Sequence, residues 1–511
     1  MRKKRLVKKI FFISAFLFLA QLWVLNSCNH LMNELDGVAE KVALYSKDAG
    51  STGSDSDSPD SSSPAPESLF ILYVSSSGND SNDGYSLENA KASVNSALSV
   101  INAASDSTAD WTVYISGKIL NTSLSIGGIS AKSLTLIGKT DNENDGLMGR
   151  LSSSPVIKVE STSTVPIIIK NLFITNGTGG IYYEGGGNLT VTDCDIRGNI
   201  TGVNGGGIYF NSSSNLLLTG ETNVGLNKAN KGGGIYLAKG TLDFSGTISN
   251  NTATNGGGIY VGSSGEVQIT GGVIGGDTAE NGNTADVGAG VYITEGGKLT
   301  LSGGKISNNS ASGMGSGIFV YKDGTSGQSG NLSMGGTVLV EDNNDVYLVN
   351  GSLITLSSAF DSAVTQAARI TPGAYTSGTQ VLSGPADLIL SEREKFSVTP
   401  NGAEGWIINS GGYLVTLNSL SFTFTLPVYS NDDIKFTATE SGTDIILSAA
   451  SGYSSYMWIV GDSLSQVTTE NTYTLPKSSL TQNQTYTIIA IATDSDGNAN
   501  SANAVLFVGG N

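Results

Sequence analysis

The chain has 511 residues, a length that allows two or three domains, and 39% of them are hydrophobic, enough for a globular core. Its formal net charge of −17 argues against binding to nucleic acid or to an anionic membrane surface. With two cysteines and a single histidine, His30, close to the amino terminus, the sequence excludes a disulfide framework, a His-ligated zinc site and a Ser-His-Asp triad in the folded part.

Residues 1–27 are expected to be a targeting segment, because a basic start precedes an apolar run from Ile10 to Leu25. The run ends at Leu25-Asn-Ser-Cys28, which resembles the processing site of bacterial lipoproteins. The resemblance implies that Cys28 is the acylated first residue of the mature chain, and an uncleaved anchor is the alternative. Asn26 departs from the usual pattern but suits the looser sites of spirochaete lipoproteins. Asn29 lacks the Asp that retains enteric lipoproteins at the inner membrane, which favours the outer membrane.

Two short segments are expected to follow the leader. Residues 28–67 form a tether, since their Ser/Asp/Pro-rich tract cannot build a core. Residues 68–110 form an amino-terminal cap with a strand, a polar turn and a helix. On that helix one face carries Val94, Ala97, Leu98 and Ile101.

A glycine-rich motif recurs along the middle of the chain. Its starts are separated by 27, 27, 24, 32 and 27 residues, a period typical of stacked repeats. Two-residue alternation between the motifs predicts strands rather than helices. The interpretation is a β-solenoid with coils over residues 111–350 and glycine at tight corners. The motif copies are 178–182, 205–209, 232–236, 256–260, 288–292 and 315–319, and the structural glycines are Gly207, Gly234, Gly258, Gly290 and Gly317.

Three residues after an apolar position, most repeats carry an amide or a carboxylate. Asparagine tolerates the left-handed backbone that a corner requires, and its side chain can bond to the next coil. We therefore expect a structural ladder rather than a ligand site, formed by Asn199, Asn227, Asn251, Asp277 and Asn309.

Two of these features resemble known families. The run from Tyr73 to Gly84 (Tyr-Val-Ser-x-x-Gly-x-Asp-x-x-Asp-Gly), followed by an amphipathic helix, resembles the amino-terminal cap of pectate-lyase-like proteins. The repeat, Ile/Val-x-x-Asn followed by Gly-Gly-Gly-Ile, is similar to that of chlamydial polymorphic outer membrane proteins and of spirochaete surface lipoproteins. Together the resemblances cover roughly residues 70–350 and imply an all-β chain built on a right-handed parallel β-helix.

The carboxy-terminal part loses the repeat. Residues 351–418 are expected to be a cap or small β extension, and residues 419–511 a separate β-sandwich with Trp458 at its centre. The Trp458 strand and the ending Ala492-Thr-Asp-Ser-Asp-Gly497 resemble PKD or immunoglobulin-like modules of bacterial surface proteins.

Few residues have side chains that are candidates for catalysis or metal binding. Asp193, Asp195 and Arg197 could serve a lyase or a hydrolase, because Asp195 and Arg197 should project outward together; the alternative is a surface ion pair. Asp277, Glu280 and Asp286 could bind calcium, or form a solvated loop. The same alternatives hold for two further carboxylate pairs, Asp80 with Asp83 and Asp494 with Asp496. We expect no catalytic residue, no metal and no cofactor.

The leading hypothesis is a non-enzymatic, lipid-anchored surface protein at the outer membrane. Its rod would hold the sandwich away from the cell and contact a host protein, matrix component or glycan, although no exposed aromatic stripe is evident in the sequence. The alternative is a polysaccharide lyase or glycosidase acting on the outer face of the β-helix, an idea that rests on fold analogy alone.

Overall fold

A computed structural model describes residues 70–510 except 121, 151–153, 325–326, 403–404, 417–419, 426–436, 442–443, 450, 462, 481–483 and 496–498. The expected leader, Cys28, His30 and the tether lie outside these residues, as does Asp496. Residues 68–511 belong to one compact unit. No helix in the described part of the chain is long and apolar enough to cross a membrane.

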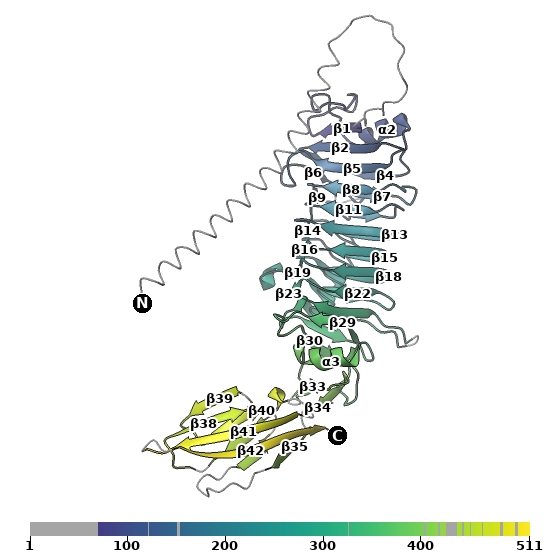
Figure 1. Ribbon diagram of the computed structural model, residues 1–511. Helices are drawn as coiled ribbons and strands as arrows, with labels where there is room; N and C mark the ends of the chain where they lie inside the picture. Colours follow the sequence, from purple (N-terminus) through teal and green to yellow (C-terminus); the bar gives the residue numbers. More distant parts are fainter. Residues whose placement is uncertain are drawn as a thin grey trace, which may run out of the picture. The chain divides into compact units, whose positions relative to one another are not determined.

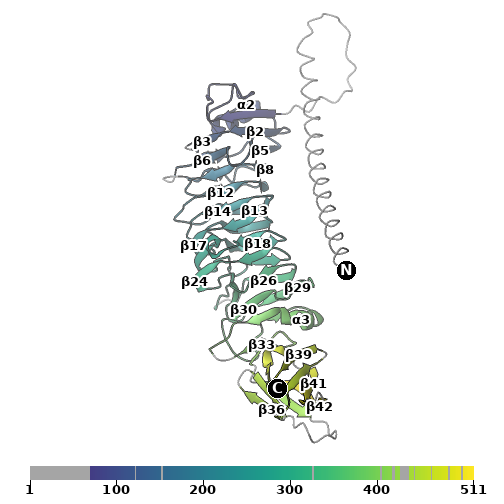
Figure 2. The ribbon, with the colours of Figure 1, turned by 90° about the vertical axis from the view of Figure 1, so that its left-hand side faces the viewer.

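The central part is a parallel β-helix, in which successive coils stack along one axis (Figures 1 and 2). The largest sheet, sheet A, contributes one long strand or two short strands to each coil, and its strands pair in parallel. Its strands are β1 (Phe70–Ser75), β2 (Asp110–Ser116), β4 (Leu124–Ile126), β5 (Ser133–Gly138), β7 (Ile157–Val159), β8 (Ile167–Lys170), β10 (Ile181–Tyr183), β11 (Leu189–Thr192), β13 (Ile208–Thr219), β15 (Ile235–Phe244), β18 (Ile259–Ile269), β21 (Val291–Ile293), β22 (Lys298–Leu301), β25 (Ile318–Val320), β26 (Asn331–Gly336), β28 (Asp345–Leu348), β29 (Ile354–Phe360), β30 (Ala368–Pro372), β31 (Leu382–Ser383) and β32 (Phe396–Val398).

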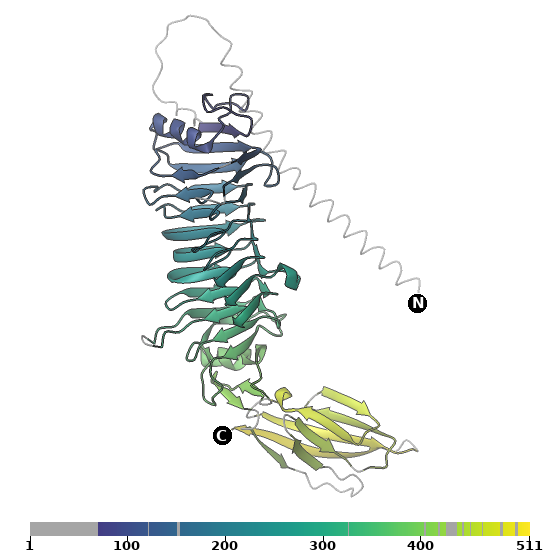
Figure 3. The same cartoon turned by 180° about the vertical axis from the view of Figure 1, so that it is seen from behind.

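Two further parallel sheets complete the coils. Sheet B contains β3 (Lys118–Leu120), β6 (Gly146–Met148), β9 (Phe173–Thr175), β12 (Asp195–Arg197), β14 (Asn223–Gly225), β16 (Thr247–Ser249), β19 (Val273–Gly275), β23 (Lys305–Ser307) and β27 (Leu339–Val340). Sheet C contains β17 (Thr252–Asn255), β20 (Thr284–Val287) and β24 (Ser310–Met314). The insertion with the 3₁₀ turn η1 (Ala279–Asn281) projects from the stack (Figure 3, teal).

The core follows from the two-residue alternation. The isoleucine or valine of each glycine motif stacks on its counterpart in the next coil, as Ile208, Ile235 and Ile259 do, and these three side chains are fully buried. A single unit has no partner for this apolar face, so stacking supplies the core. The predicted solenoid is confirmed by this register.

The amino-terminal cap has the expected strand and helix. Strand β1 pairs in parallel with β2, and α2 (Val94–Ala104) buries Val94, Ala97, Leu98 and Ile101. The Ser93 side chain accepts the N–H of Ser96 and begins the helix.

Parallel pairing continues beyond the expected boundary at residue 350. Strands β28, β30 and β32 remain in register through Val398. They are followed along the chain by an antiparallel hairpin of β33 (Trp406–Ile408) and β34 (Leu414–Thr416). Between β31 and β32 lie α3 (Ala386–Glu392) and the 3₁₀ turn η2 (Arg393–Lys395).

The carboxy-terminal strands form two antiparallel sheets with one buried cluster, which includes Trp458, Tyr456 and Ile488. Two such sheets are compatible with a β-sandwich, which stays a prediction. One sheet contains β35 (Leu420–Thr425), β42 (Ala499–Gly510), β41 (Gln484–Thr493), β38 (Ser455–Val460) and β39 (Ser463–Thr468); the other contains β36 (Thr437–Ser441), β37 (Asp444–Ser448) and β40 (Thr472–Pro476), after which the chain forms the 3₁₀ turn η4 (Lys477–Ser479).

Candidate functional site: the faces of the β-helix and a cavity near its end

One asparagine per coil forms a buried, hydrogen-bonded row at the corner after sheet B. Asn227 Nδ2 donates to Asn251 Oδ1 (3.1 Å), and Asn251 Nδ2 donates to Asn283 Oδ1 (2.9 Å). Asn251 Oδ1 also accepts the backbone N–H of Asn227 at 3.0 Å. The row thus satisfies buried backbone and side-chain groups together. Its members are Asn199, Asn227, Asn251, Asn283, Asn309 and Asn344.

Asn199, Asn227, Asn251 and Asn309 lie in this row as predicted, but the prediction for Asp277 is wrong. Asp277 is exposed, because the extra residues of the longest repeat come before the corner and Asn283 takes the ladder position.

The expectation that the ladder asparagine itself has the left-handed backbone is also wrong. It lies one position earlier than the ladder asparagine, at Leu226 (φ 56°), Asn250 (φ 56°) and Asn308 (φ 57°). The ladder amide therefore contributes by hydrogen bonding alone.

The third glycine of each motif is required by close packing between coils. A Cβ on Gly207 would lie 2.6 Å from the Gly234 carbonyl oxygen and 2.9 Å from Asn227 Nδ2. A Cβ on Gly234 would meet the Gly258 carbonyl oxygen at 2.7 Å. Gly258, Gly290 and Gly317 face the same approach of the next coil, so these positions are structural.

An aromatic stack, which the sequence analysis did not identify, lies on the outer side of sheet A. Neighbouring rings are nearly parallel, with centroids 5.4 Å apart for Tyr209 and Tyr236 and 4.9 Å for Tyr260 and Tyr292. Most of the rings are half-buried, and Tyr260 and Phe319 are buried. In the sequence, the signal for this stack is the aromatic residue that ends each copy of the glycine motif. The rings belong to Tyr182, Tyr209, Tyr236, Tyr260, Tyr292, Phe319 and Tyr347.

A second row of outward side chains on sheet A, carried by β18, β22, β26, β29 and β31, consists mainly of uncharged polar residues. Along the carboxy-terminal half the register joins Gln268, Thr300, Ser333, Thr355 and Ser383. The hydroxyl groups of Thr355 and Ser383 lie 3.0 Å apart. At about 4.8 Å between strands, the row repeats similar hydrogen-bonding groups along the axis. We call these five residues the polar row.

The candidate catalytic residues on β12 contact one another. Arg197 Nε lies 2.9 Å from Asp195 Oδ2, and its guanidinium covers the Phe173 ring at 4.8 Å. Asp195 also accepts a hydrogen bond from Asn223 Nδ2 (3.1 Å), and burial raises the pKa of its carboxyl above the ordinary value. Both side chains point outward as predicted.

The neighbouring Asp193 has a different role from Asp195. It occupies a left-handed turn (φ 53°), and its Oδ1 accepts the Glu221 N–H at 3.1 Å. The geometry of Asp193, Asp195 and Arg197 is therefore that of a turn and a partly buried ion pair.

The remaining carboxylates do not gather. Asp277 and Glu280 are exposed in the η1 insertion, and Asp286 lies 3.3 Å from Ser312 Oγ on sheet C. Asp80 accepts the N–H groups of Ala92 and Ser93 before α2. Within the described residues, no three His, Cys, Asp or Glu side chains are placed to hold a metal ion.

Cys194 is fully buried and free, two residues before the equally buried Ile196. Burial raises the pKa of its thiol to about 12, so the reactive thiolate is suppressed at neutral pH.

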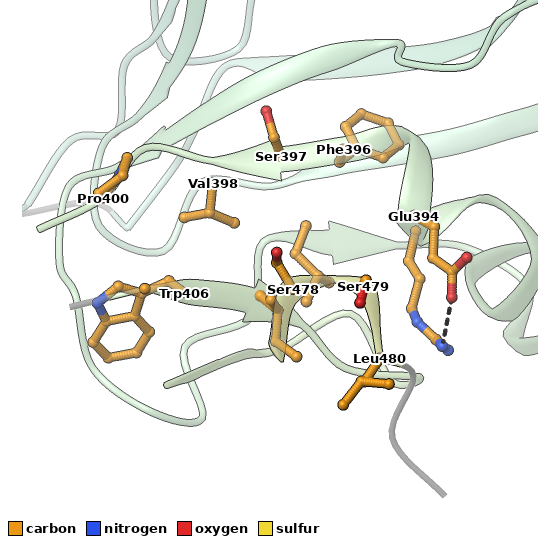
Figure 4. Close-up of a pocket in the computed structure, with 13 residues that line it drawn as sticks. Glu394, Phe396, Ser397, Val398, Pro400, Trp406, Ser478, Ser479 and Leu480 are labelled. Atoms are coloured by element: carbon orange, nitrogen blue, oxygen red, sulfur yellow. Dashed lines mark hydrogen bonds and ion pairs between the residues drawn. The ribbon is translucent and has the colours of Figure 1, made fainter. Parts of the chain in front are cut away.

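A cavity of about 570 Å³ lies beside β32, β33 and η4 (Figure 4). Its volume is in the range of ~300–1,000 Å³ typical of ligand pockets. The Arg393 side chain in its wall is only 7% exposed, and its Nη2 lies 3.3 Å from Glu394 Oε1. Figure 4 shows Val398 and Ser397 pointing to opposite sides of β32. Sequence reasoning missed this cavity, because Arg393 and Ser478 are distant in the chain.

Comparison with known proteins bears on the fold. A family model described as "right handed beta helix region" matches residues 151–274. No match was found among curated proteins or among solved structures. Together with the parallel sheets, the match identifies the fold as a right-handed parallel β-helix, which is compatible with both surface proteins and pectate-lyase-like enzymes.

Proposed function

We propose that the protein is a non-enzymatic, lipid-anchored surface protein whose β-helix binds an extended partner and displays the β-sandwich. The basic and apolar leader ending at Cys28 supports lipidation, as does its similarity to spirochaete sites. The Ser/Asp/Pro-rich residues 28–67 support a tether between the lipid and the folded part. The proposed location is the outer membrane.

The polar row is the observation that carries the binding proposal. Gln268, Thr300 and Ser333 lie in register on adjacent coils and point outward with partial exposure. A row of this kind can exchange hydrogen bonds with a partner that lies along the axis, and the many small contacts add up. The partner class is a host protein, a matrix component or a glycan, and the acidic charge of the chain disfavours nucleic acid.

The arrangement of Asp195 and Arg197 supports a structural role for the pair. A lyase would need the arginine free to remove a proton from the substrate. Here the Arg197 side chain is held between the carboxylate of Asp195 and the ring of Phe173.

A single assay separates the two functions. The full-length chain in detergent is incubated with neutral and acidic polysaccharides and with extracellular-matrix proteins, with and without calcium. We expect retention of at least one partner, loss of retention when Gln268→Arg and Thr300→Arg are combined, and no new reducing ends. Turnover that disappears in Asp195→Ala or Arg197→Ala would establish the enzyme instead.

The anchor is tested separately by metabolic labelling with palmitate. We expect label on the wild-type chain and none on Cys28→Ser, which should also leave the membrane fraction. Equal labelling of both chains would disprove lipidation at Cys28.

A further inference from the structure

We infer that Asn350 is a site of self-modification, at which the backbone nitrogen of Gly351 converts the side-chain amide into an acid. Asparagine followed by glycine favours this reaction, because glycine has no side chain to hinder the attack. Where the flanking residues are described, the dipeptide occurs at Asn176, Asn204, Asn255, Asn281 and Asn350. The hydrogen bonds of the β-helix set the last of these apart from the others. This chemistry needs neither the anchor nor the partner of the proposed function.

The reaction is an intramolecular displacement. The Gly351 nitrogen loses its proton to water and attacks Cγ of Asn350, so that a nitrogen–carbon bond forms, the bond to the side-chain nitrogen breaks and ammonia leaves. Water then opens the five-membered imide at either carbonyl, which gives aspartate or isoaspartate at position 350. Both products carry one more negative charge than the encoded chain. The reaction requires a backbone N–H that is free to lose its proton and a peptide group that is free to rotate toward the side chain.

The turn between β28 and β29 meets both requirements. Asn350 and Gly351 are exposed, and the Ser352 N–H donates to the Val349 carbonyl oxygen at 2.7 Å across them. Gly351 has a φ of 83°, as expected at the third position of such a turn. Among the described residues, the peptide group that joins Asn350 to Gly351 has no partner for its N–H or for its C=O. It can therefore rotate without breaking a hydrogen bond of the β-helix.

At the glycine motifs, the same dipeptide is held by the neighbouring coil. The N–H of Gly205 donates to the Lys231 carbonyl oxygen at 2.9 Å, and the N–H of Gly256 donates to the Val287 carbonyl oxygen at 3.1 Å. Both glycines are buried. The asparagine before each of them should therefore react slowly, because the attack requires the loss of a buried hydrogen bond between coils.

The two remaining dipeptides are also restrained. The N–H of Gly177 donates to Oδ1 of the ladder residue Asn199 at 3.0 Å. The Asn281 carbonyl oxygen accepts the Asn250 N–H at 3.0 Å, so the peptide group that joins Asn281 to the buried Gly282 is not free to rotate. We therefore expect slow conversion at both of these positions.

Peptide mapping of the full-length chain in detergent by mass spectrometry tests the site. The chain is incubated in mildly alkaline buffer made with heavy-oxygen water and digested in ordinary water, so that conversion during the incubation carries the label. We expect the rate at Asn350 to exceed the rates at Asn204 and Asn255 at least ~10-fold, about 1.4 kcal/mol in activation free energy. A rate at Asn350 no higher than at Asn204 would overturn the assignment.

The unfolded chain is the control for local sequence. In denaturant the rates at Asn350, Asn204 and Asn255 should converge, since glycine follows each of them and the bonds between coils are lost. A rate ratio that persists in denaturant would attribute the difference to neighbouring residues in the sequence, and would likewise overturn the assignment.

Substitutions test the residues in the folded chain. Asn350→Gln would have to close a larger ring from an exposed position, so it should fold normally and leave its peptide unlabelled. Asn199→Ala removes the acceptor of the Gly177 N–H and should raise the rate at Asn176 several-fold relative to Asn255, with circular dichroism as the check on folding. An unchanged relative rate in folded Asn199→Ala would contradict protection by hydrogen bonding. If this variant does not fold, the wild-type ratio of Asn350 to Asn204 decides.

Discussion

At the scale of single residues, Asn251 bonds to the coils on both sides of it. Its Nδ2 donates to the Val224 carbonyl at 2.8 Å in the preceding coil and to Asn283 Oδ1 at 2.9 Å in the following coil, and its Oδ1 accepts the Asn227 N–H at 3.0 Å. Asn251→Ala should lower the free energy of unfolding by about 3 kcal/mol, because each buried group left unpaired costs ~1–3 kcal/mol. A reduced denaturation midpoint measures this loss. Asn230→Ala, at an exposed position, is the control, and equal midpoints for both variants would contradict the prediction.

Leu226 has a left-handed backbone although it is neither glycine nor asparagine. Its φ is 56° and its side chain is 58% exposed, so little packing compensates the strain. Leu226→Asn should raise the free energy of unfolding by about 1 kcal/mol, since leucine in this conformation costs ~1–2 kcal/mol and Asn250 occupies the same position of the next coil.

The measurement for Leu226→Asn is again the denaturation midpoint. Leu217→Asn serves as the control, because Leu217 is exposed on the extended strand β13 and should gain nothing. A midpoint that falls in Leu226→Asn would show that the leucine side chain contributes more than its backbone costs.

At the scale of elements, the buried and half-buried tyrosines of sheet A make the stability of the β-helix sensitive to alkaline pH. Burial raises the pKa of Tyr183 from 10.0 to about 12, and burial also raises the pKa values of Tyr209 and Tyr236. The unfolded chain therefore loses phenolic protons before the folded chain does. The stability that these groups contribute is fully present below pH 10 and is lost as the pH rises from 10 toward 12 and above.

The alkaline prediction is tested with the combined substitution Tyr209→Phe and Tyr236→Phe. Phenylalanine keeps the stack, as Phe319 does between Tyr292 and Tyr347, and removes two ionisable groups. Alkaline unfolding, followed by circular dichroism and tyrosinate absorbance, should decline less steeply in the double variant. Identical alkaline curves would show that these tyrosines do not govern the loss of stability.

At the scale of the whole molecule, the β-helix is a sum of coils that contact only their neighbours. Deletion of residues 232–255 removes one period, from the start of one glycine motif to the residue before the next. Ile208 would then stack on Ile259 and the β-helix should remain folded with one coil fewer. Deletion of residues 232–243 removes half a period, brings outward positions against the core and should unfold the neighbouring coils.

Circular dichroism and denaturation midpoints measure both deletions. A native-like spectrum for the first and a loss of β signal for the second are the expected results. Equal disruption by the two deletions would contradict the nearest-neighbour description.

Sequence alone determined the repeat, the strands within it, the cap helix and the glycine corners. These features can be predicted because the period and the alternation are local patterns. Each coil also packs against a neighbouring coil of similar sequence. The pattern failed at Asp277, where an insertion shifted the register and only the stacking of Asn251 on Asn283 decided the ladder position.

Tertiary structure alone decided which outward residues meet. The motif tyrosines are at least 24 residues apart in sequence, and only coil stacking brings their rings face to face. The cavity beside Arg393 joins β32, β33 and η4, whose residues share no local pattern. Side chains that point inward are dictated by alternation, whereas contacts between distant segments depend on how the chain packs in space, and that is why the fold was predictable and the cavity was not.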